Sequence, residues 1–149
     1  MRHHAWIGLV LILSMALPCA AAGTAEEIIT ETGLQGGLIV HLGCGGGKLT
    51  ASLGADGRFV VHGLDASAAN VEAARAFLRK KGLYGRASVA LLDDKRLPYV
   101  DNLANLVVAD ALGDVPMSEV MRVLAPEGVA RIGGRKTGKP RPKDPAEWQ

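Results

Sequence analysis

Aromatic residues are scarce in this sequence: phenylalanine, tyrosine and tryptophan make up 4% of its 149 residues. So few flat side chains offer no evident platform on which the bases of single-stranded nucleic acid could stack. The formal net charge of +2 is also too small to indicate a polyanionic partner. The basic residues concentrate at positions 131–143, in a proline- and glycine-rich stretch that is typical of a solvated linker. We therefore expect no nucleic-acid partner.

The sequence has two cysteines, and its N-terminal apolar run of 13 residues, at positions 5–17, is short of the ~20 that a membrane span needs. Basic or titratable residues precede this run and small residues follow it, which is the layout of a secretory signal peptide over residues 1–22. We expect export to the periplasm or secretion. The alternative is an uncleaved anchor, which would be the protein's only membrane contact. Cleavage after Ala22 would leave Cys44 alone and exclude an internal disulfide.

Apolar residues make up 48% of the chain and charged residues 21%, a composition typical of one globular domain. Short apolar runs alternate with segments that have helical periodicity. We predict strands at residues 38–42, 58–64, 87–92, 103–109 and 129–132, and helices at residues 25–32, 48–53, 67–81 and 116–124. This order predicts an α/β fold, with a Rossmann-like parallel sheet of about five strands and flanking helices.

A glycine loop lies between the first predicted strand and the second predicted helix. Gly43 permits a tight turn, Gly45 permits close approach of a ligand, and Gly47 permits the next helix to pack on the strand. Asp65 follows 22 residues after Gly43, at the end of the second strand, where a carboxylate can accept hydrogen bonds from ribose. The alternative is an ordinary glycine turn, followed by an aspartate that caps the next helix.

The spacing of the three glycines is G-x-G-x-G, whereas a dinucleotide loop has G-x-G-x-x-G. S-adenosylmethionine (SAM) has no pyrophosphate, so it does not need a helix N-terminus directed at phosphate. The spacing therefore favours SAM, and an NAD-type oxidoreductase is the weaker alternative.

Several motifs, taken in order, resemble those of the class I SAM-dependent methyltransferases. His-Leu-Gly-Cys-Gly-Gly-Gly-Lys-Leu-Thr at 41–50 is similar to the first motif of that family, and Val-His-Gly-Leu-Asp at 61–65 to the second. Asp-Asp-Lys-Arg-Leu-Pro-Tyr at 93–99 is similar to the third. The fourth strand at 105–109 and Arg-Val-Leu-Ala-Pro-Glu-Gly at 122–128 complete the set. The resemblance covers residues 24–132, which we predict to be the methyltransferase-like domain.

The resemblance implies SAM as the cofactor, no metal, and a set of cofactor-binding residues. The methionine end would lie against the glycine loop, the ribose on the strand-end aspartate, and the adenine beside the residues that follow the second and third strands. These residues are Gly43, Cys44, Gly45, Gly47, Asp65, Ala66, Asp93 and Asp94. For Asp93 and Asp94 a solvated turn is the alternative.

Three features depart from the family pattern. His41 stands where the family usually has an acidic residue, so SAM binding should be weaker or altered, and more so at low pH. The alternative is a strand-end histidine with no ligand role. Residues 133–149 are predicted to be a Pro/Lys-rich linker or tail, so we expect a truncated sheet that lacks the family's last two strands. The catalytic residues are unknown, because no general base is identifiable from the sequence.

Two functions follow from these observations. The first is a SAM-dependent methyltransferase, a transferase of one-carbon groups, with an unknown acceptor. The second is a non-catalytic, degenerate methyltransferase fold that serves as a scaffold or interaction module in an exported, possibly multidomain protein.

Overall fold

The computed structural model describes residues 23–144 and contains the alternating helices and strands expected of an α/β fold. The predicted signal peptide (1–22) and the last five residues of the predicted tail (145–149) lie outside the described residues. Within residues 23–144, no helix is both long and apolar enough to cross a bilayer. The elements are α1 (Ala25–Thr32), β1 (Gly37–Leu42), α2 (Lys48–Gly54), β2 (Phe59–Asp65), α3 (Ala68–Lys80), β3 (Ala87–Leu91), β4 (Ala104–Ala109), α4 (Met117–Val123), β5 (Leu124–Ile132) and β6 (Arg135–Gly138).

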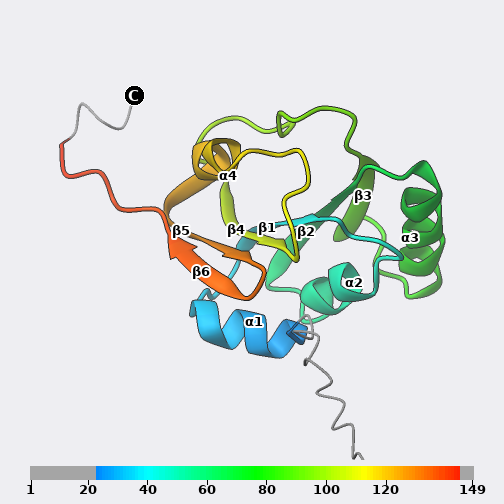
Figure 1. Cartoon of the computed structure of the whole chain (residues 1–149). Coiled ribbons are helices and arrows are strands. Elements are labelled where there is room, and N and C mark those ends of the chain that lie inside the picture. The colour runs from blue at the N-terminus through cyan, green and yellow to red at the C-terminus, as the bar shows by residue number, and fades with distance from the viewer. Residues whose placement is uncertain (1–22, 145–149) are drawn as a thin grey trace, which may run out of the picture.

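One sheet with the strand order β3-β2-β1-β4-β5-β6 forms the centre of the domain (Figure 1). The pairs from β3 to β5 are parallel, whereas β5 and β6 are antiparallel. From β1 the chain continues outward through β2 and β3, and then returns to the other side of β1 as β4. The loops after β1 and β4 therefore diverge and leave a crevice at the carboxyl ends of the strands, where α/β proteins bind ligands.

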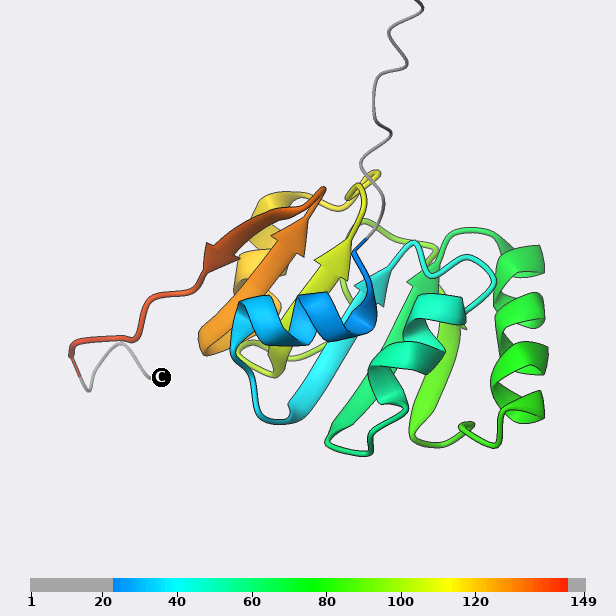
Figure 2. The same ribbon diagram turned by 90° about the horizontal axis from the view of Figure 1, so that it is seen from below.

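Two hydrophobic clusters fill the two faces of the sheet. Ile28 of α1, Leu53 of α2 and Leu78 of α3 pack on one face, together with inward residues of the strands. Val120 and Val123 of α4 pack on the other face. Figure 2, seen from the side of α1 and α2, shows α4 behind the sheet. Successive buried residues of the parallel strands belong to different clusters, as Ile39 and Val40 of β1 do, because side chains along a strand point to opposite faces in turn.

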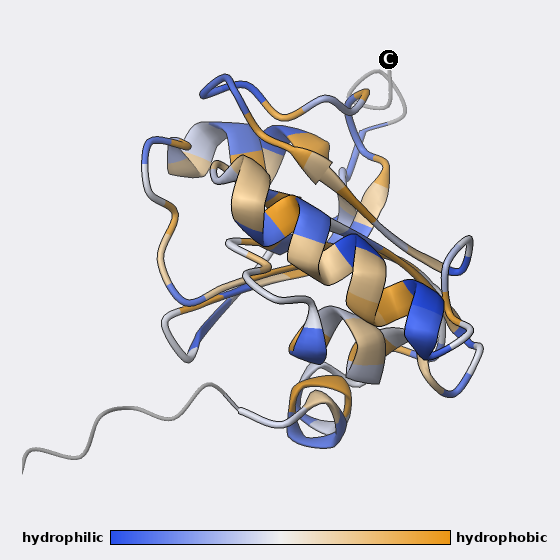
Figure 3. Ribbon diagram, turned by 90° about the vertical axis from the view of Figure 1, so that its right-hand side faces the viewer, coloured by the Kyte–Doolittle hydropathy of each residue, from blue (hydrophilic) through white to orange (hydrophobic). Residues whose placement is uncertain are grey.

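Local sequence signals explain where the first helix begins and ends. Thr24 and Glu27 form a capping box: the Glu27 N–H donates to Thr24 Oγ1 (3.3 Å), and the Thr24 N–H donates to Glu27 Oε2 (2.8 Å). Gly33 ends α1 in the left-handed conformation, with φ at +70°. Figure 3 shows α1 end-on, with its hydrophobic side toward the sheet and its hydrophilic side away from it.

The sheet has six strands, one more than the five predicted, and the additional strand lies in the segment that the sequence predicted to be a linker. Arg135–Gly138 pairs with β5, and Lys139 extends the pairing by donating its N–H to the Gly128 carbonyl (2.8 Å). The turn between the two strands is Gly133-Gly134, with φ at +55° and +77°. Positive φ at both central residues is the signature of a type I′ hairpin turn, which two glycines adopt without strain.

We predict that replacing both turn glycines, Gly133→Ala with Gly134→Ala, detaches β6 and lowers the free energy of unfolding by about 2 kcal/mol, because each alanine is forced into a left-handed conformation. Chemical denaturation followed by circular dichroism measures this loss. Gly134→Asn is the control and should be nearly neutral, since asparagine tolerates the left-handed conformation and no atom lies within 4 Å of the position that its Cβ would take. An equal loss in both variants would contradict the turn assignment.

Candidate functional site

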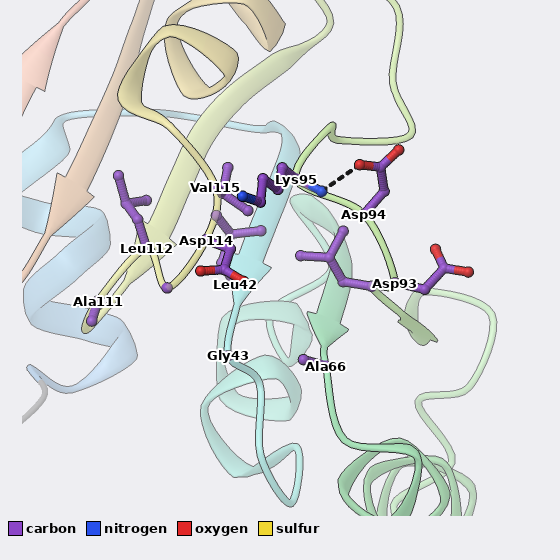
Figure 4. A pocket seen from close by; sticks show the side chains of 12 residues that line it. Leu42, Gly43, Ala66, Asp93, Asp94, Lys95, Ala111, Leu112, Asp114 and Val115 are labelled. Atoms are coloured by element: carbon purple, nitrogen blue, oxygen red, sulfur yellow. Dashed lines mark hydrogen bonds between the residues drawn. The ribbon is translucent and has the colours of Figure 1, made fainter.

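A cavity of about 710 Å³ opens at the carboxyl ends of the parallel strands, between the loops that follow β1, β2, β3 and β4. Apolar side chains form most of its wall, including Leu42, Leu112 and Val115. Figure 4 shows Leu42 at the end of β1, Leu112 and Val115 on the connection after β4, and the side chain of Asp114 beside Leu42. Volume and lining are those of a small-molecule site, in which a few polar groups set the orientation of the ligand.

The glycine loop leaves open space where ordinary side chains would lie. Gly43 and Gly45 have φ at +69° and +51°, and no atom lies within 4 Å of the position that a Cβ would take at either residue. A ligand can therefore approach the backbone there. Gly47 needs to be glycine for a different reason: a Cβ at this position would lie 2.9 Å from the Ala74 Cβ of α3. From the sequence we expected Gly47 to permit close packing of α2 on β1, whereas in the structure it permits close packing of the glycine loop on α3.

Asp65 holds the glycine loop and the start of α3 together. Its Oδ2 accepts from the Gly45 N–H (2.8 Å), and its Oδ1 accepts from the Ser67 N–H (2.9 Å) and the Asn70 amide (3.0 Å). A carboxylate has about four lone-pair positions, so one remains to accept a further hydrogen bond. Burial raises the pKa of Asp65, but these donors together with the nearby His41 lower it further, so the net pKa lies below the usual value.

Cys44 was expected among the cofactor-binding residues, but the structure places its side chain in the core. A Cβ at Gly63 of β2 would lie 2.9 Å from the Cys44 Cβ, so the absent side chain of Gly63 provides the space that Cys44 fills. Burial, followed by the charge of Asp65, raises the pKa of the thiol to about 11. Cys44 is therefore a protonated thiol near neutral pH and is poorly suited to act as a nucleophile.

Ala66, Asp93 and Asp94, which the resemblance assigns to the adenine, all line the cavity. The Asp94 carboxylate, however, also accepts from the backbone N–H groups of Lys95 (2.6 Å) and Arg96 (3.3 Å), which is the bonding of a turn. Figure 4 shows the carboxylates of Asp93 and Asp94 directed away from Leu42 and Ala66. The turn that the sequence offered as the alternative is therefore present, in a segment that also lines the cavity.

The structure adds cavity residues that sequence reasoning did not assign. Lys95 follows Asp94, and Figure 4 shows its side chain extending toward Val115. Leu112, Asp114 and Val115 come from the connection after β4. The signal that could have identified them is topological, because this connection starts at the carboxyl end of the strand beside β1. Within residues 23–144, His, Cys, Asp and Glu side chains form no group of three or more suited to a metal ion.

His41 points to the α2 side of the sheet and is 6% exposed. Its Nδ1 lies 2.8 Å from the Thr50 hydroxyl, within hydrogen-bond distance. Burial lowers the pKa of His41, and the charges of Asp110 and Asp65 raise it by less, so the net pKa lies below 6.5. The imidazole is therefore neutral near pH 7 and has a hydrogen-bond partner within the fold.

We predict that Gly47→Ala lowers the free energy of unfolding by roughly 3 kcal/mol, since it combines a left-handed backbone with a contact against α3 that is too close. Gly46→Ala is the matched control in the same loop. Gly46 does not have a positive φ, and no atom lies within 4 Å of the position that a Cβ would take there. Urea denaturation of both variants measures the difference. Equal free energies of unfolding in the two variants would show that neither the left-handed backbone at Gly47 nor the contact with Ala74 requires a glycine there.

We also predict that acid destabilises the protein through His41. An unfolded chain protonates this histidine near pH 6.5, whereas the folded state resists protonation, so the free energy of unfolding falls as the pH drops below 6.5 and is flat above it. Burial lowers the pKa of His62 too, so the effect of His41 is one part of the total. Denaturation at pH 7.5 and 5.5 should show a smaller pH effect for His41→Asn than for the wild type. An unchanged pH effect would exclude His41 as a contributor.

Comparison with known proteins agrees with this geometry. The family model described as "Methyltransferase domain" matches residues 39–128. The chain is 32% identical over 120 residues to the methyltransferase GfsG of Streptomyces halstedii, covering 74% of this chain and 43% of that protein.

Solved structures give the same result. A protein described as a putative SAM-dependent methyltransferase from Methanococcus maripaludis superposes with a TM-score of 0.67 at 27% identity, over 72% of this chain and 52% of the other. The (4+2)-cyclase SpnF superposes with a TM-score of 0.66 at 26% identity, over 72% and 42%. The chain thus spans about half the length of these relatives or less. It belongs to the class I SAM-dependent methyltransferases, and S-adenosylmethionine is its expected cofactor.

Proposed function

We propose that this domain binds SAM in the 710 Å³ cavity and on the glycine loop beside it, and transfers the methyl group to an acceptor that enters beside residues 111–115. The observation that carries the proposal is the open face over Gly43 and Gly45, directly beside the Asp65 carboxylate that is bonded to the Gly45 N–H. A small open backbone loop next to a strand-end carboxylate fits an adenosyl ligand with a methionine tail.

Each part of the site has a separate task in this proposal. The backbone at Gly43 and Gly45 receives the methionine end, the remaining lone pair of Asp65 accepts one ribose hydroxyl, and Ala66 lies against the adenine. SAM supplies an electrophilic methyl group when bound. Leu42, Leu112 and Val115 exclude water from the space between the two ligands.

The acceptor is of unknown identity, and the cavity wall on its side carries Asp114 and Lys95. Asp114 is the one carboxylate that the connection after β4 contributes to the described cavity wall. Figure 4 shows its oxygens beside Leu42. We assign to it the acceptance of a proton from the nucleophile, where the reaction needs one. Proximity and alignment of acceptor and methyl group supply the remainder of the rate enhancement.

His41 supports a second candidate, a methyltransferase fold without methyl transfer. A neutral imidazole bonded to Thr50 replaces the carboxylate that the family usually has at the end of β1. SpnF, whose fold is similar, is described as a (4+2)-cyclase, so a related fold occurs in a protein named for a different reaction. The predicted export signal also favours this candidate, because SAM is made in the cytoplasm. Under it, we propose an exported scaffold or interaction module.

We predict that titration calorimetry detects binding of S-adenosylhomocysteine to the wild type. Asp65→Asn should weaken this binding about tenfold or more, since a charge-assisted hydrogen bond to ribose is lost. Ala66→Leu should also weaken it by filling the cavity without disturbing the hydrogen bonds of Asp65. Asp56→Asn, at an exposed turn far from the cavity, is the control and should bind normally.

A folded wild type that does not bind at millimolar ligand contradicts the proposal. Incubation with SAM and a panel of acceptors then separates the two candidates. Formation of S-adenosylhomocysteine excludes the non-catalytic alternative, and binding without any turnover over the panel supports it.

A further inference from the structure

The connection between β3 and β4, residues 92–103, contains no helix or strand, although it forms one wall of the cofactor cavity. In Figure 1 it arches over the sheet on the side of α4. Asp93, Asp94 and Lys95 lie on it. The path of this connection therefore sets the width of the cavity, and no regular backbone hydrogen bonding within the connection fixes that path.

The same wall has a second hollow behind it. A cavity of about 600 Å³ shares Leu92, Asp93 and Asp94 with the cofactor cavity, and its far side includes Tyr99 and Arg122. Residues 93 and 94 thus form a partition with open space on both sides. Since little packs against the partition from behind, its position depends on the points at which its two ends are held.

Leu92 holds the first end, and Leu97 holds the second. The Leu92 N–H donates to the Asp65 carbonyl (2.9 Å), which ties the wall to the end of β2. Leu97 is 1% exposed, and both of its backbone polar groups bond to side chains of α4. Its N–H donates to Glu119 Oε2 (3.1 Å), and its carbonyl accepts from Arg122 Nη2 (3.1 Å).

Arg122 also holds the residues after Leu97. Its Nη1 donates to the Tyr99 carbonyl (2.9 Å) and to the Asp101 carboxylate (2.7 Å). The Tyr99 hydroxyl lies 2.7 Å from His62 Nδ1 on β2, so this residue is fixed at its side chain as well. A single guanidinium therefore contacts the connection at three successive points.

Glu119 orients that guanidinium. Arg122 Nε donates to Glu119 Oε1 (2.9 Å), and Nη2 donates to Oε2 (2.8 Å), which is a bidentate pair on one helix. The hydrogen bond from Arg122 is the main cause that lowers the pKa of Glu119 to about 2. Lysine cannot reproduce this arrangement, because its ammonium has three donors on a flexible stem and no planar fork.

We propose that Arg122, oriented by Glu119, is a positioning residue that sets the adenine wall of the cofactor cavity through Leu97, Tyr99 and Asp101. This inference rests on the proposed function, because it assigns the cavity to the adenosyl group. It predicts that a residue of α4 that does not touch the cofactor governs the affinity for it.

The test compares Arg122→Lys with Arg58→Lys. Arg58 pairs with Asp56 on the exposed α2–β2 turn, so Arg58→Lys is the control for disturbing an arginine–carboxylate pair that lies away from the β3–β4 connection. Calorimetry, well below the melting temperature, measures the affinities for S-adenosylhomocysteine and for adenosine. Arg122→Lys should weaken both by the same factor, about tenfold, as expected for loss of a charge-assisted hydrogen bond. Arg58→Lys should weaken neither.

Limited trypsin digestion adds a measurement that needs no ligand. Lys95 and Arg96 lie between the two anchors and are exposed, so both are trypsin sites. Arg122→Lys should speed cleavage after these residues about tenfold, as expected when a half-buried, charge-assisted hydrogen bond no longer holds the segment closed, while cleavage after Arg86 stays unchanged. If Arg122→Lys does not fold, Glu119→Gln replaces it. It retains an acceptor for the Leu97 N–H and should give smaller effects in the same direction.

The outcomes separate the two proposals. A lower melting temperature with unchanged affinities would show a purely structural role and overturn the inference, as would unchanged cleavage after Lys95 and Arg96. A wild type that binds no S-adenosylhomocysteine overturns the proposed function, and the assignment of the wall to adenine falls with it. Wild-type binding, with joint loss of affinity and protection in Arg122→Lys, supports both.

Discussion

The carboxylate of Asp65 is the interaction on which the geometry of the site depends. It accepts from the backbone of the glycine loop, from the backbone at the start of α3, and from the side chain of Asn70. The carbonyl of the same residue accepts from Leu92 and so joins β2 to the wall formed after β3. Charge-assisted hydrogen bonds in a buried position are strong and directional. Asp65, which we propose to bind ribose, thus also fixes the glycine loop, the start of α3 and the wall after β3 in place around its own carboxylate.

Features with a local cause could be predicted from the sequence. The capping box of α1, the apolar face of α3 and the alternation of strands and helices each arise from residues close together in the chain, and the structure contains all three. The glycine loop and the strand-end position of Asp65 follow from the same short-range patterns. These features place Gly43 and Asp65 at the carboxyl edge of the sheet, where the cavity opens.

Features with a non-local cause could not be predicted. The direction of the Cys44 side chain depends on the missing side chain of Gly63 on the neighbouring strand. The four residues of β6 are all exposed and carry no apolar period, so only their pairing with β5 makes them a strand. The hydrogen bonds between Leu97 and α4 join residues more than 20 positions apart. Such contacts depend on the packing of the whole domain rather than on the period of one segment.

The attachment of the β3–β4 connection to α4 has a thermodynamic consequence. Residues 111–115 line the cavity on the side that we propose for the acceptor, and the chain then enters α4, which carries Glu119 and Arg122. An acceptor that shifts α4 would therefore also shift the cavity wall that we propose for adenine, and so change the affinity for the cofactor. Linkage then requires the cofactor to change the affinity for the acceptor by the same factor. Under the proposed function, the order in which the two ligands arrive would alter the path but not the total binding free energy, and the seven-residue helix α4 would carry the coupling between them.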